Sequence, residues 1–86
     1  MAAPLQDIRV VEIASYVAVP AAGALLADLG ADVVKVEVPR GETLRHALPR
    51  RLGYRHPLPE APHFHMENRG KRSLALDLTR PGAREA

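Results

Sequence analysis

The chain of 86 residues contains no cysteine, no tryptophan and only three other aromatic side chains. Without cysteine it has neither a disulfide framework nor a thiolate nucleophile. No apolar run approaches the roughly 20 residues that a membrane-spanning helix needs. The first residues, Met-Ala-Ala-Pro, lack the basic segment and apolar core of a signal peptide, so we expect a cytoplasmic protein without a membrane partner.

The most informative stretch is residues 9–39, which has the pattern strand, helix, strand. Arg9–Ile13 is short and β-branched, and Asp32–Val38 is rich in valine, as strands are. Between them Ala21–Leu29 consists of strong helix formers, with Pro20 in a suitable place for the first helical position. This apolar helix is predicted to be buried, and Gly30 to end it in the left-handed region. The two strands are therefore predicted to be parallel neighbours.

Ligands of open parallel sheets bind outside the carboxyl ends of the strands, which here are the turns Ala14–Val19 and Pro39–Gly41. The first turn lacks the glycines of a dinucleotide fingerprint, and Gly23 inside the helix is expected to allow close packing against a strand. Glu37 stands where an acidic residue of nicotinamide-dependent enzymes binds a ribose hydroxyl. Such an enzyme is therefore an alternative, which the missing glycines disfavour. A solvated or ion-paired glutamate is the simpler interpretation.

Further elements follow the first unit. We expect a short helix at Glu42–Leu48, a proline-rich loop at Pro49–Pro62, a helical turn at His63–Glu67 and a third strand at Ser73–Leu78. Residues 79–86 resemble the first turn of another helix, so we expect residues 1–86 to be the N-terminal portion of a larger α/β protein.

Charges and histidines allow two further hypotheses. Residues 1–39 carry five acidic and two basic side chains, whereas residues 40–72 carry three acidic and eight basic ones. This asymmetry suggests an anionic small molecule, although a solvated basic surface explains it too. Nucleic acid is disfavoured as a partner, because only Phe64 accompanies the basic run of residues 69–72. A metal site is also disfavoured, because no carboxylate or thiol ligand lies near the histidines in sequence. The four histidines are His46, His56, His63 and His65.

Several segments together resemble the N-terminal part of family III CoA-transferases, the CaiB/BaiF group. The matching segments are Pro4-Leu5, Arg9–Ile13, Ala18-x-Pro20, Leu26–Glu37, Pro39-x-Gly41-Glu42 with Arg45, Asn68–Leu74, Leu76–Leu78 and Pro81. The resemblance implies a Rossmann-like parallel sheet in the large domain of an interlocked homodimer. It implies transfer of CoA between carboxylic acids, with acyl-CoA as substrate and no separate cofactor. In such transferases an aspartate attacks the thioester, and in the related α-methylacyl-CoA racemases aspartate and histidine exchange the α-proton.

The resemblance places the nucleophile beyond residue 86, so no catalytic residue is assigned among Asp7, Asp28, Asp32 and Asp77. The CoA-binding residues that it carries over are Ser15, Tyr16, Val17, Ala18, Arg40, Leu78, Thr79 and Arg80. The first four match the turn that meets the thioester arm, and the last three match the turn that holds the adenine and ribose. Arg40 is assigned to the CoA phosphates, because its planar fork suits phosphate oxygens. Asn68 and the basic run Arg69, Lys71 and Arg72 are expected to shape this edge or a dimer contact.

Departures from the family pattern limit the substrate. Val17 replaces the glutamine of formyl-CoA transferases, which disfavours formate or oxalate. Val19 replaces a common glycine and narrows the turn, and Val38 replaces a common basic residue, for which Arg40 substitutes in part. A non-catalytic Rossmann-like fragment or split subunit, completed by a partner chain, stays open as an alternative, as does a racemase.

Overall fold

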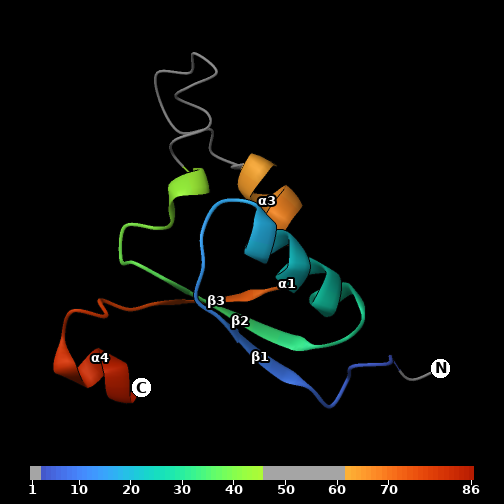
Figure 1. Ribbon diagram of the computed structural model, residues 1–86, viewed down its shortest axis with the longest axis horizontal. Helices are drawn as coiled ribbons and strands as arrows, with labels where there is room; N and C mark the ends of the chain where they lie inside the picture. The colour runs from blue at the N-terminus through green and yellow to red at the C-terminus, as the bar shows by residue number, and fades with distance from the viewer. Residues whose placement is uncertain (1–2, 46–61) are drawn as a thin grey trace.

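The computed structural model describes residues 3–45 and 62–86 (Figure 1). The elements in chain order are β1 (Arg9–Glu12), α1 (Ala18–Asp28), β2 (Asp32–Glu37), the 3-10 turn η1 (Thr43–Arg45), α3 (Pro62–Asn68), β3 (Arg72–Ala75) and α4 (Pro81–Glu85). The predicted loop at 49–62 lies almost wholly outside the described residues, as do His46, His56 and the end of the short helix predicted at 42–48. Within the described part, that helix is the single turn η1.

The three strands form one parallel sheet in the order β1-β2-β3, with β2 in the centre. Val11 pairs with Val34, and Val36 pairs with Leu74. All three strands therefore end at the same edge, which confirms the predicted parallel α/β arrangement. Since the second strand is flanked on both sides, the turns after all three strands come together.

Helix α1 begins at Ala18, two residues before the predicted start at Pro20. The prediction was wrong because proline is also tolerated later in the first turn, where backbone N–H groups have no intrahelical partner. The end of the helix is as predicted. Gly30 has φ +101°, its N–H donates to Ala27 O, and the next N–H donates to Leu26 O at 3.0 Å. These two bonds make a Schellman motif, for which glycine is the favoured residue.

The third strand is shorter than predicted, ending at Ala75 instead of Leu78. One more backbone bond, from Leu76 N–H to Glu37 O at 2.8 Å, continues the pairing with β2. Beyond it the Asp77 carboxylate accepts hydrogen bonds from the Thr79 N–H and hydroxyl groups. An aspartate that captures the backbone two residues later makes a turn and ends the strand.

Helix α1 packs on β1 and β2 and against α3, so both helices lie on one side of the sheet (Figure 1). The interior between them is half charged or polar: the buried apolar side chains are Ala24, Ala31, Val33, Leu44 and Phe64, and the buried polar ones are Glu12, Lys35, Glu37, Glu42 and Asn68. The fold of this region therefore depends on paired charges as much as on apolar contacts.

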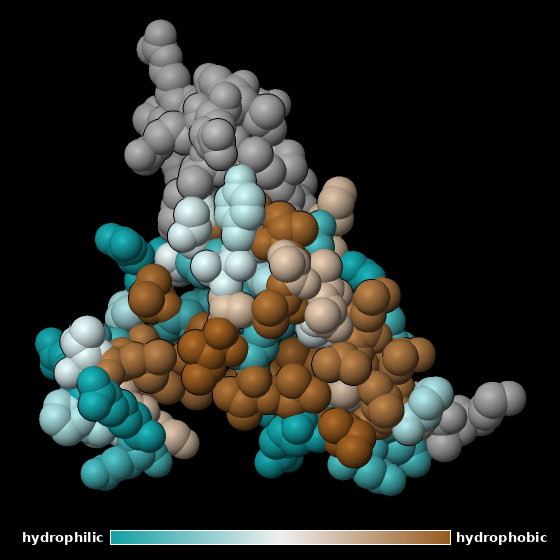
Figure 2. Space-filling model, viewed as in Figure 1, coloured by the Kyte–Doolittle hydropathy of each residue, from teal (hydrophilic) through white to brown (hydrophobic). Residues whose placement is uncertain are grey.

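The other face of the sheet is apolar and is covered by none of the described helices. Val11 is 63% exposed and Ile13 is 67% exposed on this face. Figure 2 shows hydrophobic side chains gathered over the strands and α1.

The prediction of a wholly buried α1 was also wrong, because Leu25 is 58% exposed while Pro20, Gly23 and Ala24 are buried. Only the face of α1 that meets the sheet and α3 is buried.

Candidate functional site at the carboxyl edge of the sheet

An open cavity of about 700 Å³ lies at the carboxyl ends of the three strands. Its walls come from residues 13–15 after β1, residues 36–38 and 40–43 at the end of β2, and residues 76–79 after β3. A volume of this order is typical of small-molecule sites. The sequence analysis placed the ligand at this edge, and the cavity shows that the three turns converge there.

Four of the predicted CoA-binding residues line this cavity: Ser15, Arg40, Leu78 and Thr79. The other four lie in the same turns and are exposed, but they are not part of the cavity wall: Tyr16, Val17, Ala18 and Arg80. Among the described residues of the cavity wall, Arg40 is the one with a basic side chain. The parallel topology thus brings together residues up to 64 positions apart in sequence.

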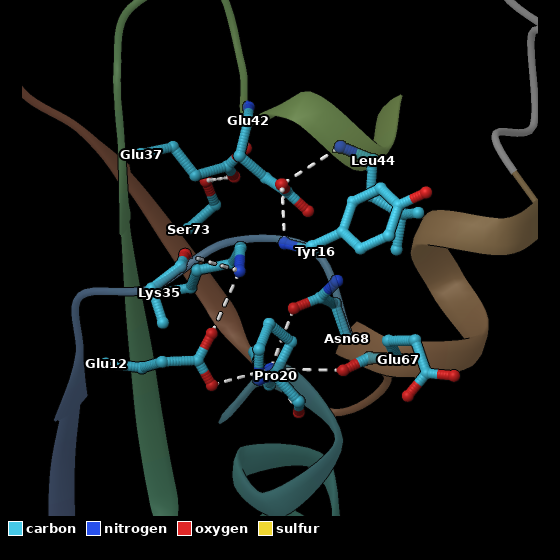
Figure 3. Close-up of polar contacts among 12 residues, drawn as sticks. Glu12, Tyr16, Pro20, Lys35, Glu37, Glu42, Leu44, Glu67, Asn68 and Ser73 are labelled. Carbon is cyan, nitrogen blue, oxygen red and sulfur yellow. Dashed lines mark hydrogen bonds and ion pairs between the residues drawn. The ribbon is translucent and has the colours of Figure 1, made fainter. Parts of the chain in front are cut away.

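The turn after β1 has an unusual backbone conformation at Tyr16. Its φ of +71° makes it the one residue other than glycine, within the described ranges, that adopts a positive φ. A non-glycine residue in this region is strained and persists only when its surroundings hold it. The Glu42 carboxylate accepts a hydrogen bond from the Tyr16 N–H at 3.2 Å and another from the Leu44 N–H at 3.0 Å (Figure 3). Glu42 therefore connects the turn after β1 to the turn after β2.

Glu37 at the end of β2 is buried at the cavity wall, and its carboxylate is engaged by groups of the chain itself. It accepts two hydrogen bonds from Arg45 at 2.9 and 3.0 Å, one from the Ser73 hydroxyl and one from the Glu42 N–H at 3.1 Å. Burial raises the pKa of Glu37, but these donors outweigh it and lower the pKa to about 2. The ion-paired alternative is thereby confirmed, and the nicotinamide hypothesis loses the residue on which it rested.

Beneath the first turn, the Glu12 carboxylate lies between two buried ammonium groups. Its oxygens are 2.9 Å from Lys35 Nζ and 2.7 Å from Lys71 Nζ, and all three side chains are at most 2% exposed (Figure 3). Burial lowers the pKa of Lys71, although the Glu12 carboxylate opposes this. Gly23 packs here because a Cβ at this position would collide with the Glu12 carboxylate. This confirms the predicted close approach and identifies a side chain, not a strand backbone, as its cause.

The two lysines also hold the backbone around the first turn. Lys35 Nζ donates to Ala14 O at 3.3 Å, and Lys71 Nζ donates to Pro20 O at 2.8 Å. Lys71 further donates to Asn68 Oδ1 at 2.7 Å. Both ends of the turn between β1 and α1 are therefore anchored to buried charges.

The two arginines of the basic run lie away from the ligand edge, and the alternative that they form a dimer contact stays a prediction. Arg69 pairs with Asp28 at the C-terminal end of α1, and Arg72 pairs with Asp32 at the first residue of β2. These aspartates lie at the opposite end of the sheet from the cavity. Lys71 alone of the three cations reaches toward the first turn, and it does so from the interior.

Sequence reasoning assigned no role to Glu42 or Asp77, which both line the cavity. Hydrogen bonds from Thr79 are the main reason that the pKa of Asp77 lies below its ordinary value, and they fix Thr79 in the third turn. The available signal for Glu42 was its place in the Pro39-x-Gly41-Glu42 segment. In the described ranges, no group of three or more potential ligands is arranged to hold a metal ion, and no helix is long and apolar enough to cross a membrane.

Comparisons of sequence and of structure both find related proteins. The family model for CoA-transferase family III matches residues 5–86. A probable fatty acyl-CoA transferase of Mycobacterium tuberculosis is 45% identical over 87 residues, which cover 98% of this chain and 21% of that protein. A succinate–glutarate CoA-transferase of Agrobacterium fabrum is 45% identical over 80 residues, covering 91% and 20%. A CaiB/BaiF family crystal structure from Brucella suis superposes with a TM-score of 0.81 at 40% identity, covering 99% of this chain and 22% of that one. The chain thus spans about a fifth of the length of these relatives.

Proposed function

This chain belongs to CoA-transferase family III, and from that premise we propose that its protein transfers CoA between carboxylic acids through acyl-CoA thioesters. The observation that carries the proposal is the cavity at the carboxyl edge, where Ser15, Arg40 and Thr79 meet. Relatives named as CoA-transferases for dicarboxylic acids support the reaction class. Residues 1–86 supply part of the CoA-binding edge in this proposal. The proposal extends to an interlocked homodimer in the cytoplasm, where acyl-CoA thioesters are made and used, with CoA as part of the substrate and no separate cofactor.

Asp28, Asp32 and Asp77 are held in contacts within the chain, and none of them is proposed as the nucleophile. Asp28 and Asp32 form ion pairs at the far end of the sheet, and Asp77 is engaged by Thr79 and Arg80. The nucleophile would thus come from residues outside this chain. The intact mass of the natural gene product and an acyl-CoA transfer assay with a panel of carboxylic acids test the proposal. Exchange of the α-proton in deuterated water without CoA transfer would instead identify a racemase.

Arg40 provides the specific test of the edge. We expect Arg40→Ala to weaken CoA binding by about tenfold or more, because one charge-assisted contact to phosphate contributes roughly 1.5–3 kcal/mol. CoA lacking its 3′-phosphate should also bind more weakly. Arg69→Ala is the matched control, since Arg69 is an exposed arginine that pairs with Asp28 far from the cavity. Unchanged affinity after both the Arg40 change and the phosphate removal would show that Arg40 does not serve the phosphates.

One observation favours a second candidate, a split subunit that binds a partner chain. Parallel sheets are normally covered on both faces, but no described element covers Val11 and Ile13. Co-expression with a polypeptide that supplies the rest of the family fold would then yield a stable complex. A cooperative thermal transition of the isolated monomer would argue against this candidate.

A further inference from the structure

Glu42 is buried at the point where two walls of the cavity meet. Only 5% of the surface of Glu42 is exposed, although the residue belongs to a turn. Its own N–H donates to Glu37 Oε1 at 3.1 Å, so the end of β2 fixes its backbone. One oxygen of its carboxylate accepts both the Tyr16 and the Leu44 N–H groups, while the other oxygen has no hydrogen-bond partner among the described residues. Burying a carboxylate is costly, and two backbone bonds on one oxygen are the hydrogen bonds that its side chain gains among the described residues.

The bond to Tyr16 acts on the part of the cavity that is least stable by itself. Tyr16 has φ +71°, and its neighbour Ser15 lines the cavity. Glu42 and Thr43 line the facing wall, so the bond from Tyr16 to Glu42 spans the junction of the two walls. Without the Glu42 oxygen, the Tyr16 N–H loses its acceptor in the second turn. The strained backbone conformation of Tyr16 then lacks the hydrogen bond that stabilises it.

We propose that Glu42 is a positioning residue, which holds the turn at residues 14–17 in the conformation that receives acyl-CoA. This inference rests on the proposed function, since it concerns the same cavity. Glu42 acts through the Tyr16 backbone and does not itself react. Its essential property is an oxygen at the correct distance from two N–H groups, so a neutral acceptor of the same length should replace it.

Three substitutions separate this role from others. Glu42→Gln keeps the length and an acceptor oxygen, Glu42→Asp keeps the charge but shortens the reach, and Glu42→Ala removes both. We expect Glu42→Gln to bind CoA within about twofold of the unchanged protein, and the other two to bind about five- to tenfold more weakly, the loss that corresponds to one ordinary hydrogen bond. The Michaelis constant for acyl-CoA should rise more than kcat falls, because the turn that receives acyl-CoA is misplaced. Loss of folded protein alone would lower the active fraction and leave the Michaelis constant unchanged.

Hydrogen exchange of the Tyr16 amide tests the connection directly in the whole protein. This amide should be protected in the unchanged protein and in Glu42→Gln, and should exchange faster in Glu42→Asp and Glu42→Ala. Asp28→Ala is the control, because Asp28 is exposed and pairs with Arg69 at the far end of α1. If Glu42→Ala does not fold, the order of Glu42→Gln and Glu42→Asp still decides the question, since a role for the charge predicts the reverse order.

Two failures are distinguishable. If the unchanged protein binds neither CoA nor acyl-CoA, the proposed function fails and this inference fails with it. If the unchanged protein binds CoA and Glu42→Asp and Glu42→Ala bind it equally well, only the positioning role is refuted. Rapid exchange of the Tyr16 amide in the unchanged protein would also refute it.

Discussion

Neutralising Glu12 is expected to destabilise the fold severely. Glu12→Gln keeps the size and polarity of the side chain but removes the negative charge between Lys35 and Lys71. These ammonium groups lie 2.9 and 2.7 Å from the carboxylate, and their side chains are at most 2% exposed. Breaking a buried ion pair by removing one partner costs about 3–5 kcal/mol. A unit of 86 residues has a total stability of roughly 4–13 kcal/mol, so the variant should lose a large part of its free energy of unfolding.

The assay is urea denaturation of the whole protein, followed by circular dichroism at neutral and alkaline pH. Burial already lowers the pKa of Lys71, and loss of the Glu12 charge lowers it further, so the unfolded state binds more protons between the folded and unfolded pKa values. The stability of Glu12→Gln should therefore rise as the pH increases through this window. Asp28→Asn is the control, because that ion pair is about half exposed on both sides and should contribute less than about 1 kcal/mol. A loss below about 1 kcal/mol in Glu12→Gln, or no recovery at alkaline pH, would refute the argument.

Two further changes test the interior. Because the pKa of Glu37 is lowered from 4.5 to about 2, its ionised form contributes about 3 kcal/mol at neutral pH, and this contribution is lost as the pH falls through that range. Acid titration of unfolding should therefore be flatter in Glu37→Gln than in the unchanged protein, and an equally steep dependence would contradict the assignment. Gly23→Ala should lower the melting temperature, because its Cβ meets the Glu12 carboxylate, whereas Gly82→Ala, with nothing within 4 Å of its Cβ, should not. Equal melting temperatures for the two glycine variants would show that Glu12 moves aside at no cost.

The sequence was sufficient to predict the parallel strand–helix–strand unit, because valine-rich strands, helix formers and Gly30 act locally. It also predicted the edge at which the cavity lies, since parallel strands end together. It did not predict that Lys35 is buried, because its partner Glu12 lies 23 positions away in sequence. Within the strand alone, a lysine among valines is the pattern of a polar residue on an exposed face. Glu42 was missed for the same reason: its bond to Tyr16 joins residues 26 positions apart, and apart from its place in the segment Pro39-x-Gly41-Glu42 it resembles a solvated turn glutamate.

The fit between Gly23 and Glu12 restricts the routes by which this sequence can change over evolutionary time. A side chain at position 23 overlaps the Glu12 carboxylate, which must shift out of its ion pairs or be lost to make room. That loss in turn leaves Lys35 and Lys71 buried without their shared counter-ion. A lineage that exchanges Gly23 or Glu12 alone passes through an intermediate with overlapping atoms or with two buried ammonium groups that have lost their shared counter-ion. Positions 12 and 23 are therefore expected to change together or not at all, although one is the last residue of β1 and the other lies inside α1.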